Sequence, residues 1–140
     1  MKILLAVDGS PYTKRMLAWL ATHEEWLSGS HTYTVLTVVP SIPPHAASMF
    51  PTEQLKGYYE DTAEAVFKPI RKFTAKHDLA TDYVSKVGFA AEVIAKVADK
   101  GKHDLLIMGS HGHGNLMNLV TGSVATQVLA RSKVPVLLVR

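Results

Sequence analysis

The most informative part of this chain reads Leu105-Leu106-Ile107-Met108-Gly109-Ser110-His111-Gly112-His113-Gly114, followed by Thr121-Gly122-Ser123-Val124. The apolar run predicts a β-strand that ends at Gly109, and a helical pattern resumes at about Ser123. Because glycine has no Cβ, the main chain can approach a ligand closely here and can adopt a positive φ. A helix that begins just beyond offers unpaired N–H groups and the positive end of its dipole. The sequence therefore predicts a loop that binds phosphate.

Five short apolar runs predict strands, and four segments with helical spacing lie between them. The strands are expected at Ile3–Val7, Tyr33–Val39, Asp82–Val87, Leu105–Met108 and Val134–Val139. The helices are expected from Ser10-Pro11 onward, from about Glu53 to His77, over Ala91–Lys100 and over about Ser123–Arg131. This alternation favours a single α/β domain over residues 1–140, with a parallel sheet and helices on both faces.

Prolines mark three places along the chain. Ser10 is expected as the N-cap of the first helix, with Pro11 at its first helical position. Pro69 falls inside the second helix and should kink or interrupt it. The segment Pro40–Pro51 contains four prolines and is predicted to be neither helix nor strand. A loop of this length after the second strand suits a lid or a mobile segment.

Composition narrows the class of protein. The 140 residues are 47% hydrophobic and 19% charged, as expected for one soluble globular domain. No apolar run approaches the roughly 20 residues that a membrane-spanning helix needs, so no membrane partner is expected. The chain has no cysteine, which suits a reducing cytoplasm. The net charge of +3 comes from scattered residues rather than from a basic stripe, so nucleic-acid binding is not expected.

Ligands of open parallel sheets bind beyond the carboxyl ends of the strands. Three segments lie at such ends, namely Asp8-Gly9-Ser10, Val38-Val39-Pro40 and Gly109–Gly114. If the first and fourth strands are neighbours, these segments meet at one cleft. Asp8 suits a ribose hydroxyl, or Mg²⁺ that bridges phosphates through water, because a carboxylate repels a bare phosphate. Asp8 could instead serve only as a turn residue before Gly9.

The spacing of the glycines resembles that of a known family. Gly109, Gly112, Gly122 and Ser123 match the motif G-x-x-G-(nine residues)-G-[S/T] of the ATP-binding universal stress proteins. On the residues alone, Gly109 could merely end a strand and Ser123 could merely cap a helix. The resemblance covers nearly the whole chain, because residues 2–10, 87–94 and 122–139 also look like the corresponding blocks of that family.

The resemblance implies a Rossmann-like open sheet of the adenine nucleotide alpha hydrolase-like type. Its five parallel strands would follow the order 3-2-1-4-5. It also implies a homodimer paired through the last strand, Val136–Val139. That strand is uncharged and aliphatic, and left bare at a sheet edge it would invite aggregation. Pairing with a second copy is a common solution.

The resemblance also implies which residues bind the nucleotide. Gly109 and Gly112 would bring backbone amides to the ribose and phosphates. The N–H groups of Gly122, Ser123 and Val124 would hold the outer phosphates, and the strand ends at Ala6 and Val38 would contact adenine. The complete expected set is Ala6, Asp8, Val38, Met108, Gly109, Gly112, His113, Gly122, Ser123 and Val124.

His111 and His113 stand where the family often carries arginine or lysine. No third ligand follows nearby, so we expect no metal bound directly by the protein. A neutral imidazole donates one hydrogen bond, and a protonated one adds positive charge near neutral pH. We hypothesise that nucleotide affinity rises as the pH falls from about 8 to about 6. The other five histidines are expected at the surface or in loops.

The implied function is binding of ATP, ADP or AMP, with magnesium on the phosphates, in stress-response regulation. No Asp or Glu lies between Gly109 and Ser123 to act as a general base, and the lysine of the Walker motif is absent. We therefore expect no catalytic residue and at most slow turnover. Two alternatives stay open. One is a slow ATPase or self-phosphorylating protein, and the other is a dimeric interaction module that binds no nucleotide.

Overall fold

A five-stranded parallel sheet forms the centre of the molecule. The computed structural model describes residues 1–114 and 119–140. Within them the strand order is β3-β2-β1-β4-β5, which confirms the predicted order 3-2-1-4-5. The strands are β1 (Lys2–Ala6), β2 (Thr32–Val39), β3 (Thr81–Val87), β4 (Leu105–Gly109) and β5 (Val136–Val139). Their ends differ from the predicted ends by no more than two residues.

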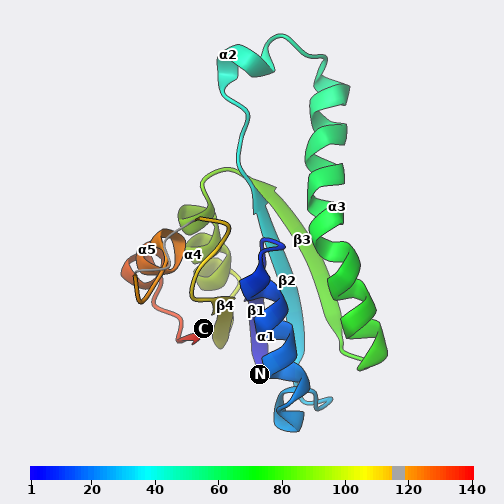
Figure 1. The fold of residues 1–140 in the computed structure, drawn as a ribbon, viewed down its shortest axis with the longest axis vertical. Coiled ribbons are helices and arrows are strands. Elements are labelled where there is room, and N and C mark those ends of the chain that lie inside the picture. The colour runs from blue at the N-terminus through cyan, green and yellow to red at the C-terminus, as the bar shows by residue number, and fades with distance from the viewer. Residues whose placement is uncertain (115–118) are drawn as a thin grey trace.

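Helices cover both faces of the sheet, as predicted (Figure 1). One face packs against α1 (Pro11–Ala21) and α3 (Thr52–Lys76), and the other packs against α4 (Ala90–Lys100) and α5 (Ser123–Arg131). Alternate residues of β1 serve the two cores, because successive side chains of a strand point to opposite faces. Ile3 and Leu5 join the α1 and α3 side, whereas Leu4 and Ala6 join the other side. Burial on both faces explains the continuous aliphatic run of this strand.

The connections contain two short elements that the sequence did not predict. A 3-10 turn spans Glu24–Trp26, and the helix α2 spans Pro44–Ala47. The expectation that all of Pro40–Pro51 is irregular was therefore wrong. Pro44 occupies the first helical position, where its fixed φ favours a turn, and the Ala47 N–H donates to the Pro43 carbonyl at 2.9 Å. Figure 1 shows α2 and the start of α3 extending beyond the carboxyl edge of the sheet.

Two prolines affect neighbouring elements differently. Pro69 does not interrupt α3, contrary to one expectation, because the helix is continuous over Thr52–Lys76. Pro69 and Ala65, whose carbonyl loses its usual donor, are both exposed, so water can satisfy that carbonyl. β5 begins at Val136, directly after Pro135, rather than at the expected Val134. Among the described helices, none combines the length and the apolar character that a membrane span requires.

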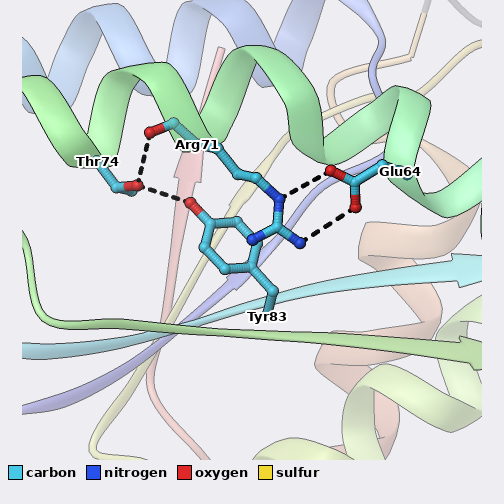
Figure 2. A network of polar contacts seen from close by, with 4 residues as sticks. All are labelled: Glu64, Arg71, Thr74 and Tyr83. Carbon is cyan, nitrogen blue, oxygen red and sulfur yellow. Dashed lines mark hydrogen bonds and ion pairs between the residues drawn. The ribbon is translucent and has the colours of Figure 1, made fainter.

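Helix α3 is fastened to the edge strand β3 by a polar and aromatic cluster (Figure 2). The Arg71 guanidinium lies 4.1 Å from the centroid of the Tyr83 ring. It also donates two hydrogen bonds to Glu64, with distances of 2.9 and 3.1 Å. The Tyr83 hydroxyl lies 2.7 Å from Thr74 Oγ1, on the next turn of α3. Arg71 therefore forms an ion pair with Glu64 within α3 and a cation–π contact with Tyr83 of β3.

We predict that Arg71→Ala lowers the free energy of unfolding by about 1 kcal/mol, and that Glu64→Ala lowers it by less than about half of that. The ion pair is weak because about half of each side chain is exposed (46% and 56%), whereas the ring contact also depends on packing. Urea unfolding of both variants measures the difference. Equal losses would show that the ion pair, rather than the contact with Tyr83, carries the stabilisation.

His103 is the one buried histidine among the described residues, with 8% exposure, although it lies in a loop as expected. Neither ring nitrogen has a hydrogen-bond partner in the described part of the chain. Burial lowers the pKa of His103 below its ordinary value of 6.5, and the nearby charge of Lys2 lowers it further. The folded protein therefore resists protonation at this position.

Because of this lowered pKa, we predict that the free energy of unfolding decreases as the pH is lowered. Below about pH 6.5 the unfolded chain binds a proton at His103 that the folded protein does not bind. The folded protein therefore loses stability as the pH falls from 6.5 to the lowered pKa of His103. Above pH 6.5 the stabilisation from His103 is fully present. Urea unfolding at about pH 7.5 and about pH 5.5 should show a smaller acid-induced loss for His103→Phe than for wild type. The exposed His45 supplies the control, because His45→Gln should keep the wild-type loss. An unchanged loss in His103→Phe would contradict the assignment.

Candidate functional site

A cleft of about 170 Å³ opens beyond the carboxyl ends of β1, β2 and β4. β1 pairs with β4 over Ile3–Ala6, so the turn after β1 lies beside the loop after β4. The predicted meeting of three strand ends is therefore confirmed. The cleft is lined by all ten of the expected residues, Ala6, Asp8, Val38, Met108, Gly109, Gly112, His113, Gly122, Ser123 and Val124. Their roles as nucleotide ligands stay predictions.

One end of the cleft is apolar. Ala6, Val38 and Met108 form it together with residues that sequence reasoning missed. Ala90 and Ile94 come from the first turns of α4, at a spacing that places both on one face of the helix. The sequence shows that spacing, but it does not show that the face lies over the ends of β1 and β2. The lining residues outside the expected set of ten are Val7, Thr13, Ala90, Ile94, His111, Gly114 and Ala125, of which His111 and Gly114 belong to the segment expected at the cleft.

Asp8 divides its two carboxylate oxygens between the turn and the cleft. Oδ1 accepts hydrogen bonds from the Ser10 N–H at 2.9 Å and from the Thr13 hydroxyl at 3.1 Å. Oδ2 lies on the side of Gly112, where a Cβ would come within 2.7 Å of it. The turn role and an exposed acceptor therefore coexist in one residue. Ser10 is the N-cap residue of α1 as predicted, but its side chain makes no capping hydrogen bond.

The loop glycines are required for space. A Cβ on Gly109 would lie 2.6 Å from Tyr12 Cβ, and a Cβ on Gly122 would lie 3.1 Å from both His111 Cα and the Ser110 carbonyl. None of Gly109, Gly112 and Gly122 has a positive φ, so that part of the expectation was wrong. The tightest approach is therefore that of Gly109 to the start of α1, whereas Gly112 lies against the Asp8 carboxylate and Gly122 lies against the backbone of the loop itself.

The backbone donors near the phosphate end are fewer than predicted. The Gly122 N–H donates to the Ser110 carbonyl at 2.6 Å, so it is already occupied. Ser123 and Val124 are the first two residues of α5, and their N–H groups have no intrahelical acceptor. These two groups and the Ser123 hydroxyl are donors that α5 offers to the cleft, at the positive end of the helix dipole.

Two histidines hold the loop in place. His113 Nε2 lies 2.7 Å from the Asp8 carbonyl and so joins the loop after β4 to the turn after β1. His111 Nε2 lies 2.7 Å from the Leu119 carbonyl, and its Nδ1 lies 2.9 Å from Ser110 Oγ. The His111 ring also lies 5.0 Å from the Tyr12 ring. Nowhere in the described residues do three or more His, Cys, Asp or Glu side chains gather as a metal site.

Comparison with known proteins assigns the family. The sequence model of the universal stress protein family matches residues 1–140. This chain belongs to the universal stress protein family. The resemblance drawn from the glycine spacing is thereby confirmed at the level of the family.

Individual universal stress proteins match nearly the whole chain. One from Thermus aquaticus, named for its place in the 3′ region of a QAH/OAS sulfhydrylase, is 36% identical over 138 residues, which are 99% of this chain and 97% of that protein. Slr1230 from Synechocystis is 31% identical over 139 residues, which are 99% of this chain. The chain spans only 42% of the length of Slr1230.

Solved structures share the fold. MJ0577 from Methanocaldococcus jannaschii superposes with a TM-score of 0.83 at 28% identity, covering 99% of this chain and 94% of that one. An Arabidopsis thaliana universal stress protein with AMP bound has a TM-score of 0.71 at 15% identity, with coverage of 99% and 90%. One from Archaeoglobus fulgidus in complex with dAMP has a TM-score of 0.70 at 20% identity, with coverage of 100% and 98%.

The spatial role of Gly109 predicts a contrast between two alanine variants. Gly109→Ala should lower the free energy of unfolding by about 1 to 3 kcal/mol, because its Cβ meets the Cβ of Tyr12 rather than a flexible side-chain end. Gly57→Ala is the matched control inside α3, where no atom lies within 4 Å of the added Cβ. It should raise stability by up to about 1 kcal/mol. Chemical denaturation measures both, and a neutral Gly109→Ala would contradict the packing argument.

Proposed function

We propose that this universal stress protein binds an adenine nucleotide, ATP, ADP or AMP, in the cleft and acts as a regulatory protein in the stress response. The observation that carries the proposal is the division of the cleft into an apolar end and a donor end. Ala6, Val38 and Met108 suit the faces of a purine ring, and the start of α5 suits an anion. The AMP and dAMP complexes of other family members support the same ligand class.

Asp8 lies between the two ends, as a ribose ligand should. Its Oδ2 is beside Gly112, and its Oδ1 is fixed by Ser10 and Thr13, so the carboxylate is oriented before any ligand arrives. A ribose hydroxyl can donate to this carboxylate without the repulsion that a phosphate would meet. In this arrangement magnesium enters on the phosphates of the nucleotide. The protein supplies backbone donors and shape rather than a catalytic base.

A homodimer through β5 is part of the same proposal. β5 is the outermost strand of the sheet, and its hydrogen bonds to β4 use only one of its two edges. The free edge belongs to Val136-Leu137-Leu138-Val139, which has no charged side chain to discourage pairing. A second copy related by a two-fold axis would cover it. The chain would then act through the surface of the dimer and its bound nucleotide.

Gly122→Val tests the position of the phosphate end. We expect it to abolish ATP binding in calorimetry, with and without magnesium, because the added Cβ would already press on Ser110 and His111 before its methyl groups are counted. Gly57→Ala, far from the cleft on α3, should bind as wild type does. Ser123→Ala adds a milder variant that keeps the backbone and should weaken ATP roughly threefold to tenfold. Wild-type affinity in both Gly122→Val and Ser123→Ala would show that the phosphates bind elsewhere.

A further inference from the structure

The cleft lacks a permanent cation to meet the phosphates. No lysine or arginine is among the described residues that line it, and the whole sequence has none between Lys102 and Arg131. On α1, neither Lys14 nor Arg15 is among the described lining residues, and the Arg15 guanidinium lies over the Tyr12 ring at 4.7 Å. The charged or titratable side chains that line the described cleft are Asp8, His111 and His113. Backbone amides alone would leave the charge of a phosphate poorly balanced.

The hydrogen bonds of the histidines determine which ring nitrogens carry protons. A carbonyl oxygen can only accept, so His113 Nε2 must donate to Asp8, and His111 Nε2 must donate to Leu119. In the neutral rings the Nδ1 atoms are therefore acceptors. For His111 that acceptor is used, because Nδ1 lies 2.9 Å from Ser110 Oγ, whose hydroxyl can donate. Neutral His113 thus has no N–H left for a phosphate.

We propose that His113 becomes the phosphate ligand of this cleft when it is protonated, so that nucleotide binding takes up a proton. This inference rests on the proposed nucleotide binding. Protonation adds an N–H at Nδ1 and a positive charge, and it leaves the bond from Nε2 to the Asp8 carbonyl intact. His113 is exposed and lines the cleft, so a proton and a ligand can both reach it.

The described lining carries few charged groups. Asp8, on the turn after β1, is the carboxylate of the lining, and a bound phosphate would add a second negative group. α4, α5 and β2 contribute only uncharged residues to the described lining, namely Ala90, Ile94, Ser123, Val124, Ala125 and Val38. His111 adds no new donor on the ligand side, because both of its nitrogens already face Leu119 and Ser110. Protonation of His113 therefore adds an N–H donor that faces no acceptor among the described residues, whereas protonation of His111 would add charge alone.

Magnesium-free calorimetry with adenosine and AMP tests this inference. When the pH is lowered from about 8 to about 6, the wild-type affinity for AMP should rise roughly tenfold. The reason is that protonated His113 can donate a charged hydrogen bond to the phosphate, whereas neutral His113 can donate none. Adenosine has no phosphate, so its affinity should stay constant. Buffers with different ionisation heats should show proton uptake with AMP and none with adenosine.

His113→Gln supplies the decisive comparison, because its amide can still donate to the Asp8 carbonyl but cannot be protonated. His113→Gln should bind adenosine as wild type does, and its affinity for AMP should not show the increase at low pH that protonation of His113 causes. Any pH dependence that remains in His113→Gln comes from the titration of the AMP phosphate itself, and it is subtracted from the wild-type pH dependence. His45→Gln, on α2 outside the cleft, should match wild type at every pH.

The outcomes separate the two proposals. If AMP binds His113→Gln and wild type with the same dependence on pH, the role of His113 is overturned while nucleotide binding stands. If neither adenosine nor AMP binds to the wild-type protein at any pH, the proposed function is wrong and the inference falls with it. His113→Arg adds a positive check, since a permanent cation should raise the affinity for AMP at about pH 8 toward the wild-type value at about pH 6.

Discussion

The pairing of β1 with β4 is the interaction on which the rest of the structure depends. These two strands are distant in the sequence, yet they are neighbours at the centre of the sheet, with Ala6 opposite Met108. Their carboxyl ends therefore lie side by side, and the turn with Asp8 meets the loop with the glycines. Because the strand order changes direction at this point, the helices that follow β1 and β4 lie on opposite faces and leave the space between them open.

Close approach of these two segments explains why the loop tolerates no side chains at its glycines. Gly109 lies against Tyr12 of α1, Gly112 lies against Asp8, and Gly122 lies against its own loop at His111. The bond from His113 to the Asp8 carbonyl adds a polar connection across the same gap. The loop is thus positioned by steric limits and by the hydrogen bonds of His111 and His113, with no lysine or arginine among the described lining residues.

Placement of charge distinguishes the two ends of the cleft. The apolar end is made by strand residues that also belong to the core shared with α4 and α5, so its shape is held by the packing of the domain. The other end is made by the loop and by the first residues of α5, where backbone N–H groups and two histidines lie.

The sequence by itself determined the five strands, the four main helices, their order along the chain and the glycine-rich loop after β4. Hydrophobic periodicity and glycine spacing are local properties, and they indicated the five strands, the four main helices and the glycine loop. The resemblance to the universal stress proteins supplied the set of ten expected site residues, including Ala6 and Val38. Only the tertiary structure decided how each group is used. It showed that the Gly122 N–H donates to the Ser110 carbonyl, that α4 contributes Ala90 and Ile94 to the cleft, and that His103 is buried. The reason is that hydrogen-bond partners and burial are set by segments distant in the chain, and their approach is not encoded at any single position.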